Sequence, residues 1–133
     1  MGSILAKIFS LLGLISIIFS FILLVAMMSS GGGGGGFISL AAIFSIIAFG
    51  AWLIGNIFGV LAVIFSRGSR DIFTGVILIF ISMIHLIPVG YVVIAIFNSP
   101  SVGLMDMSII LALLLIGVFY LKTGFNRVRG SYN

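Results

Sequence analysis

Ionisable side chains are scarce in this chain, so each one inside a hydrophobic run is a candidate for chemistry. His85 is the only histidine among 133 residues, and Ser82 lies three residues earlier, on the same face of a helix. A histidine at mid-membrane depth can relay protons or line an ion pathway. A relay normally includes carboxylates, and none accompanies His85 in its hydrophobic run. We therefore expect a structural His85 that donates a hydrogen bond to a serine or carbonyl group on a neighbouring helix; a small transporter that uses His85 is an alternative.

Asn56 is a second polar residue inside a hydrophobic run, where its amide is expected to form a hydrogen bond between helices.

One histidine and one amide are not a set of catalytic groups. The chain has no cysteine and no glutamate, and its two carboxylates, Asp71 and Asp106, both stand at the edges of hydrophobic runs. The sequence offers no carboxylate pair, no nucleophile with a base and no set of metal ligands. We expect no enzymatic activity, no cofactor, no bound metal and no small-molecule substrate.

The elements that carry these residues are four long hydrophobic segments. The chain is 62% hydrophobic and only 6% charged, which is too few charges for the polar surface of a soluble domain. The segments cover about residues 4–28, 37–65, 72–97 and 102–121. Crossing the hydrocarbon core takes roughly 20 residues of helix, and lipid offers the backbone no other hydrogen-bond partners. The sequence predicts an all-α polytopic membrane protein: one domain, 1–133, with four transmembrane helices in an antiparallel bundle.

The basic residues predict the orientation. With four spans, every Lys and Arg falls on the side of the two termini, whereas the loops at 29–36 and 98–106 contain none. The positive-inside rule then places both termini on the cytoplasmic side of a prokaryotic plasma membrane, or on the inner side of a virion membrane. Basic residues beside membrane helices bind anionic headgroups. We expect this of Arg67 and Arg70 and, in a basic tail at 122–133, of Lys122, Arg127 and Arg129. These charges are too few to indicate a nucleic-acid partner.

Small residues predict how the first two helices meet, because membrane helices associate through close packing. They recur every three or four residues in the second segment, at Ala41, Ser45, Ala48, Ala51, Gly55, Gly59 and Ala62, and in the first at Ser10, Gly13 and Ser16. We expect these two faces to pack together, with a contact between copies of the chain as the alternative.

The glycine-rich stretch at 29–36 is expected to be a hairpin turn; an engineered linker and a partner contact are its alternatives.

The stretch "NIFGVLAVIFSRGSRDIFTGVILIFISMIHLIPVGYVVIAIF" at 56–97 resembles a pattern in small, uncharacterised four-helix prokaryotic membrane proteins. In that pattern a helix ends in a short basic Gly/Ser turn and leads into a Gly-containing helix, and the resemblance implies no known activity. Length and helix count are also similar to those of small multidrug resistance transporters, but those proteins couple protons through a glutamate that this chain lacks. Dual-topology fluoride channels differ in their pore motif and in having no comparable charge segregation.

The features of this sequence concern packing and anchoring rather than chemistry. We therefore expect a small integral membrane protein that acts as a structural or accessory subunit of a larger membrane assembly. Its partners would be the lipid bilayer and other membrane subunits, or further copies of itself. A pore-forming homo-oligomer, of a channel or holin-like kind, is the main alternative.

Overall fold

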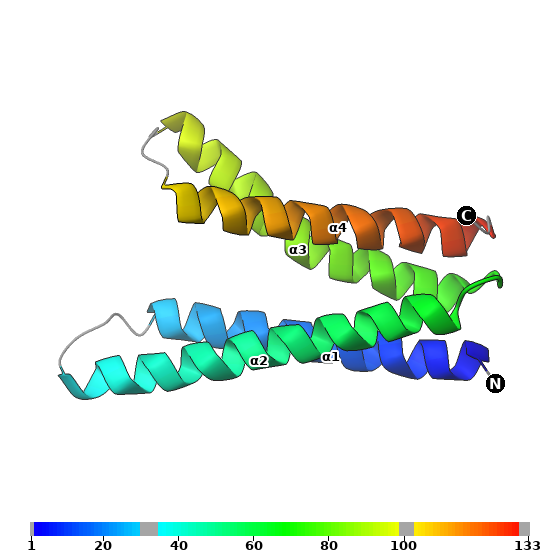
Figure 1. The fold of residues 1–133 in the computed structure, drawn as a ribbon, viewed down its shortest axis with the longest axis horizontal. Helices are drawn as coiled ribbons and strands as arrows, with labels where there is room; N and C mark the ends of the chain where they lie inside the picture. Colours follow the sequence, from blue (N-terminus) through cyan, green and yellow to red (C-terminus); the bar gives the residue numbers. More distant parts are fainter. Residues whose placement is uncertain (1, 30–34, 99–102, 131–133) are drawn as a thin grey trace. The chain divides into compact units, whose positions relative to one another are not determined.

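The computed structural model describes residues 2–29, 35–98 and 103–130, and these residues form four helices (Figure 1). The helices are α1 (Gly2–Ser29), α2 (Gly35–Phe65), α3 (Ile72–Asn98) and α4 (Leu104–Arg129). Each contains a stretch of 23 to 27 residues that is long and apolar enough to cross a membrane. The all-α class expected from the sequence is confirmed, and four such helices indicate an integral membrane protein.

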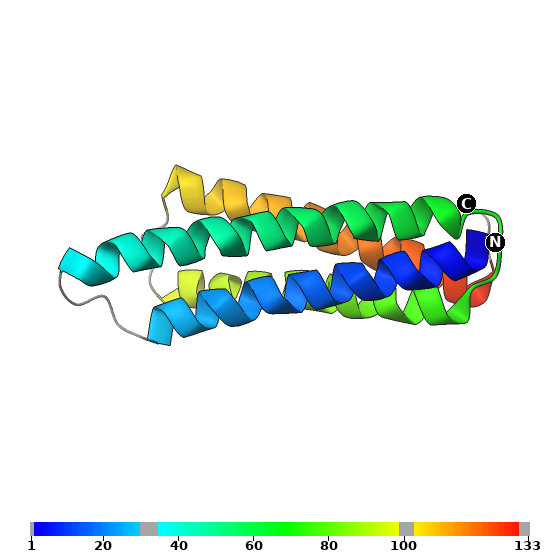
Figure 2. The same cartoon turned by 90° about the horizontal axis from the view of Figure 1, so that it is seen from below.

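The helices form two compact units, Met1–Phe65 and Ser66–Asn133. In the first unit α1 packs against α2, and in the second α3 packs against α4 (Figures 1 and 2). The chain reverses direction within the first unit: Gly2 lies beside Phe65, whereas Met27 lies beside Ser45. The single domain expected from the sequence stays a prediction.

In the first unit the buried positions follow a heptad-like spacing. On α1 the steps alternate between four and three residues, through Ala6, Ser10, Gly13, Ile17 and Ser20. On α2 the buried residues include Ala48, Gly55, Gly59 and Ala62. A repeat of 3.5 residues keeps one narrow face of a helix against its neighbour. The small side chains on these faces allow the two backbones to approach closely.

The backbones of α1 and α2 approach closely at Gly13 and Gly55. A Cβ atom added to Gly13 would lie 2.9 Å from the Gly55 carbonyl oxygen, and one added to Gly55 would lie 3.0 Å from the Gly13 oxygen. Backbones this close make dispersion contacts and Cα–H···O interactions. Nearer the basic end, the Phe9 ring stacks with Phe58 and Phe65 at centroid distances of 5.8 and 5.4 Å.

The second unit repeats this device with Gly75 of α3 and Gly124 of α4. A Cβ added to Gly75 would lie 2.7 Å from the Gly124 oxygen, and the reverse distance is 2.8 Å. Two turns earlier on α4, Gly117 makes room for Leu86, whose Cγ would be 2.6 Å from an added Cβ. The contacts of Gly75, Gly117 and Gly124 were not among the sequence predictions.

The ends of the second unit are also defined by specific residues. Asp71 caps α3: its Oδ1 accepts a hydrogen bond from the Thr74 N–H at 3.1 Å. At the other end α4 continues to Arg129 and stops at Gly130, whose φ of 78° is left-handed and whose N–H donates to the Asn126 oxygen. The fourth helix is therefore longer than the expected 102–121, and residues 122–129 of the expected basic tail are helical.

Candidate functional site

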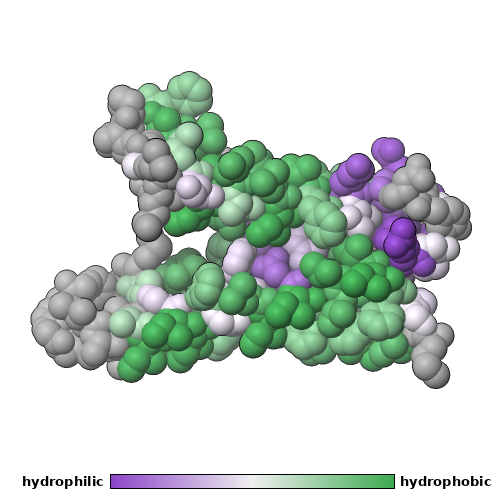
Figure 3. All heavy atoms as spheres, in the orientation of Figure 1, coloured by the Kyte–Doolittle hydropathy of each residue, from purple (hydrophilic) through white to green (hydrophobic). Residues whose placement is uncertain are grey.

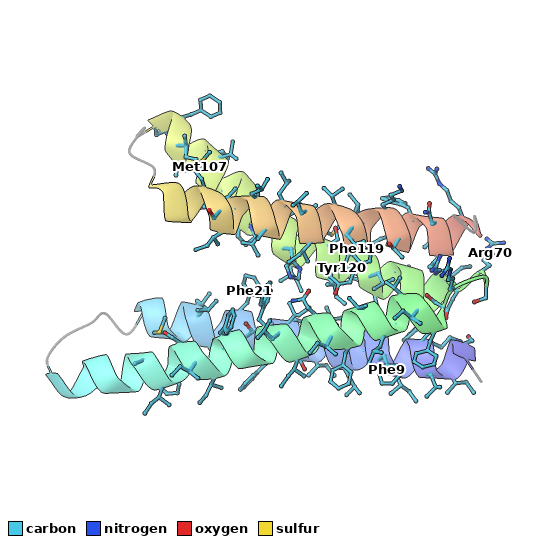
Figure 4. The ribbon with its side chains drawn as sticks, viewed as in Figure 1. Phe9, Phe21, Arg70, Met107, Phe119 and Tyr120 are labelled. Atoms are coloured by element: carbon cyan, nitrogen blue, oxygen red, sulfur yellow. The ribbon has the colours of Figure 1, made fainter. Side chains whose placement is uncertain are left out.

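His85 is fully buried on α3, beside α4. Its Nδ1 lies 2.8 Å from the carbonyl oxygen of Ile81, one turn earlier on the same helix. A carbonyl oxygen only accepts, so Nδ1 carries a proton and donates it in this bond. The ring lies 6.0 Å from that of Tyr120 on α4 (Figure 4). This hydrogen bond is made within His85's own helix. The hydrogen bond to a neighbouring helix that the sequence predicted stays a prediction.

Ser82 and Asn56 are the other two polar candidates. Ser82 is also fully buried, and its Oγ has no hydrogen-bond partner among the described residues. Asn56 belongs to the other unit and donates from Nδ2 to the Trp52 oxygen at 2.9 Å, within its own helix. The described residues contain no group of three His, Cys, Asp or Glu side chains that would hold a metal ion.

A buried polar cluster joins the turn before α3 to the end of α4. Arg127 is only 5% exposed, and its Nε donates to the Ser66 Oγ at 2.8 Å. Asp71 is 4% exposed, and its Oδ2 accepts a hydrogen bond from the Thr74 Oγ1 at 2.7 Å. The charge of Arg127 interacts with two neighbours: Arg67 repels it and Asp71 attracts it. Arg127 is buried, unlike the four other basic residues that the sequence grouped with it as expected headgroup ligands.

The four remaining basic residues of this unit are exposed, and we call them the exposed basic face: Arg67, Arg70, Lys122 and Arg129. Arg70 donates from Nε to the Val128 oxygen at 3.2 Å, which holds it against the last turn of α4. The Arg129 guanidinium lies 5.9 Å from the centre of the Phe125 ring. In Figure 3 hydrophilic atoms gather around the C-terminal end of α4, and Figure 4 places Arg70 there.

The small residues predicted to pack helices have the following positions. Ala48, Gly55, Gly59, Ala62, Ser10 and Gly13 are buried, whereas Ser45, Ala51 and Ser16 are half-buried. The Ser45 hydroxyl donates to the Met27 sulfur at 3.1 Å. The side chain of Ala41 lies outside the described residues, as do residues 30–34 of the hairpin turn expected at 29–36. Ser29 ends α1 and Gly35 begins α2, so the ends of that stretch are helical.

Sequence reasoning missed the packing role of Gly75, Gly117 and Gly124. A signal was present on α4, where Gly117, Tyr120, Gly124 and Arg127 are spaced three, four and three residues apart and are all buried. That spacing marks one helix face. This spacing would have predicted that Arg127 lies on the face of α4 that packs against α3.

Comparisons with known proteins do not add a function to this geometry. No family model, no curated protein and no solved structure matches the chain.

Proposed function

We propose that this chain is a non-enzymatic structural or accessory subunit of a larger membrane assembly. Its four helices would form an antiparallel bundle, with both termini on the inner side of a prokaryotic plasma membrane or a virion membrane. The segregation of Lys and Arg supports this orientation. The hydrogen bond from Arg127 to Ser66 supports a structural role, because it connects the end of α4 to the turn before α3.

The observation that carries the proposal is the uneven packing of the second unit. On α3 every buried residue lies between Thr74 and Val89. On α4 no described residue from 107 to 116 is buried. The unpacked part of α3 includes two large aromatic side chains, Tyr91 at 77% exposure and Phe97 at 86%. A wide apolar surface at one end of a helix pair is suited to another membrane helix, and exposed aromatic residues are frequent anchors of protein contacts.

The packing of α2 argues against the pore alternative as the sequence framed it. The face of α2 that would join subunits contains Gly55 and Gly59, and Gly13 of α1 already occupies it. The exposed side chains that the structure describes at 8–27 and 42–65 are all apolar, so these stretches contain no exposed polar stripe to line a water-filled channel.

A pair of phenylalanines on α3 provides a matched test. A photo-crosslinking phenylalanine analogue is placed either at Phe97, in the unpacked part, or at Phe80, which is 54% exposed in the packed part. We expect Phe97 to crosslink one other polypeptide in fixed ratio in native membranes, and Phe80 to crosslink mainly lipid. Lipid adducts alone at both positions would contradict the proposal.

Single-cysteine labelling tests the proposed orientation, because the chain has no native cysteine. Asn98→Cys reports the end of α3, and Ser69→Cys reports the turn before it. A membrane-impermeant maleimide added to intact cells should label Asn98→Cys but should label Ser69→Cys only after permeabilisation. The opposite pattern would reverse the orientation.

A further inference from the structure

We propose that the exposed basic face of the second unit is a binding site for the phosphate of an anionic phospholipid. It comprises Lys122 and Arg129 on α4, together with Arg70 and Arg67 in the turn before α3. The proposal goes beyond the accessory role and requires only that the protein is inserted in a membrane.

In the described residues of the second unit, no exposed acidic side chain lies near these cations. Asp71 is the only acidic side chain that the structure describes, and it is 4% exposed and bonded to Thr74. Its charge interacts with that of the buried Arg127. The four exposed cations therefore have no exposed carboxylate beside them in the described residues, and an anion from outside the chain would complete them.

Two of these cations share a surface with an aromatic side chain. Lys122, Phe125 and Arg129 are spaced three and four residues apart, so they lie along one exposed face of α4. The Arg129 guanidinium over the Phe125 ring is a cation–π arrangement that keeps this long side chain close to the helix. An aromatic ring between two cations suits the boundary between acyl chains and headgroups, where rings lie among the acyl ends and cations reach the phosphates.

Arg70 is positioned so that its guanidinium can also bind the lipid phosphate. Its Nε bond to the Val128 oxygen uses one of the five N–H donors of the guanidinium. Its aliphatic carbons lie against Gly130, where an added Cβ would be 3.3 Å from the Arg70 Cδ. The terminal Nη1 and Nη2 groups can donate to two oxygens of one phosphate. A lipid is favoured over free phosphate because these residues end a membrane-spanning helix, where lipid headgroups are concentrated.

The test measures lipid adducts of the full-length protein by native mass spectrometry in micelles that contain equal phosphatidylglycerol and phosphatidylcholine. The unaltered protein should retain phosphatidylglycerol preferentially. Each charge removed should lower that preference about fivefold, and the double variant Lys122→Gln/Arg129→Gln about 25-fold. Lys7→Gln removes an exposed charge of α1 that is not part of the proposed site and serves as the matched control, with a smaller change than either single variant of the site.

Equal retention of the two lipids by the unaltered protein would overturn the proposal, as would an equal loss in Lys7→Gln, which would indicate only a net-charge effect. Displacement of the lipid by millimolar inorganic phosphate would identify a free-anion site and overturn it as well. If the double variant does not keep its helical circular dichroism, a salt series on the unaltered protein decides: the preference should fall as ionic strength rises, and a salt-independent preference contradicts the site. None of these outcomes depends on a partner subunit, so they are separate from the test of the proposed function.

Discussion

At the scale of single residues, Arg127 shows how neighbouring side chains decide what a basic residue does at the end of a membrane helix. Arg127 and Arg129 are two positions apart and point to different sides of α4. Arg127 is buried against the Ser66 hydroxyl, whereas Arg129 is exposed and lies over Phe125. A charge withdrawn from solvent needs hydrogen bonds and a counter-charge. Residue type alone therefore does not identify a headgroup ligand.

Ser66→Ala should be destabilising because it removes the acceptor of the buried Arg127 Nε. We expect the free energy of unfolding to fall by about 1–3 kcal/mol, the cost of an unsatisfied buried charged donor. Denaturant unfolding in micelles, followed by circular dichroism, measures this. Ser69→Ala is the control: the Ser69 hydroxyl is only half-buried and donates to the Ser66 carbonyl, so the expected change is within about 0.5 kcal/mol. Equal effects of the two substitutions would exclude a stabilising role for the Arg127–Ser66 bond.

Ser82→Ala should leave stability unchanged or raise it by up to about 1 kcal/mol. The Ser82 hydroxyl is fully buried and has no partner in the described part of the chain, so removing it also removes a desolvated polar group. The same unfolding assay applies. A loss above about 1 kcal/mol would mean that the hydroxyl has a partner in the folded protein and that the pairing around His85 is different from the one described.

At the scale of elements, both helix pairs use one device: two glycines that face each other and let the backbones touch. Gly13 with Gly55 and Gly75 with Gly124 place a carbonyl oxygen within 3.0 Å of where the partner's Cβ would be. A carbonyl oxygen in a helix backbone cannot move aside as a flexible side chain can. Any side chain at these positions must push the helices apart.

Gly13→Ala and Gly124→Ala are expected to lower the free energy of unfolding by about 1–3 kcal/mol, the usual cost of overpacking. Gly50→Ala and Gly90→Ala are the matched controls, because an added Cβ would meet nothing within 4 Å at either position. The controls should be neutral or gain up to about 1 kcal/mol from the better helix propensity of alanine. Thermal unfolding in detergent ranks the four variants. Equal stability of the two groups of variants would contradict the close glycine contacts described here.

The sequence predicted part of this arrangement. The small-residue faces at Gly13 and Gly55 could be recognised because Ala and Ser recur around them at helical spacing. The second pair lacks such a stripe: Tyr120 separates Gly117 from Gly124 on the same face, and Gly75 is followed by large aliphatic residues. Its contact depends on which helix lies opposite, which local patterns do not contain. The end of α4 was placed too early because Lys122 was taken as the end of the hydrophobic span, whereas the helix stops only where Gly130 adopts a left-handed φ.

At the scale of the whole molecule, hydrophobic composition and charge distribution already indicated a membrane protein, and four helices long and apolar enough to cross a bilayer agree with that. Composition could not indicate where packing stops within a helix. In the second unit, all buried residues of α3 lie from Thr74 to Val89, and no residue in the turns that follow is buried. An accessory subunit would bind another membrane protein through these turns, whereas a protein that acts alone would leave them in contact with lipid.

Native mass spectrometry of the protein, purified in mild detergent from its own membrane, tests that central claim most directly. The accessory role predicts a different membrane protein bound in fixed stoichiometry. It also predicts that this partner is reduced when Phe97, 86% exposed, is changed to Ala but is retained when Phe80 is changed in the same way. A homogeneous monomer or homo-oligomer that carries only lipid would contradict the account and favour a pore or a self-assembled shell.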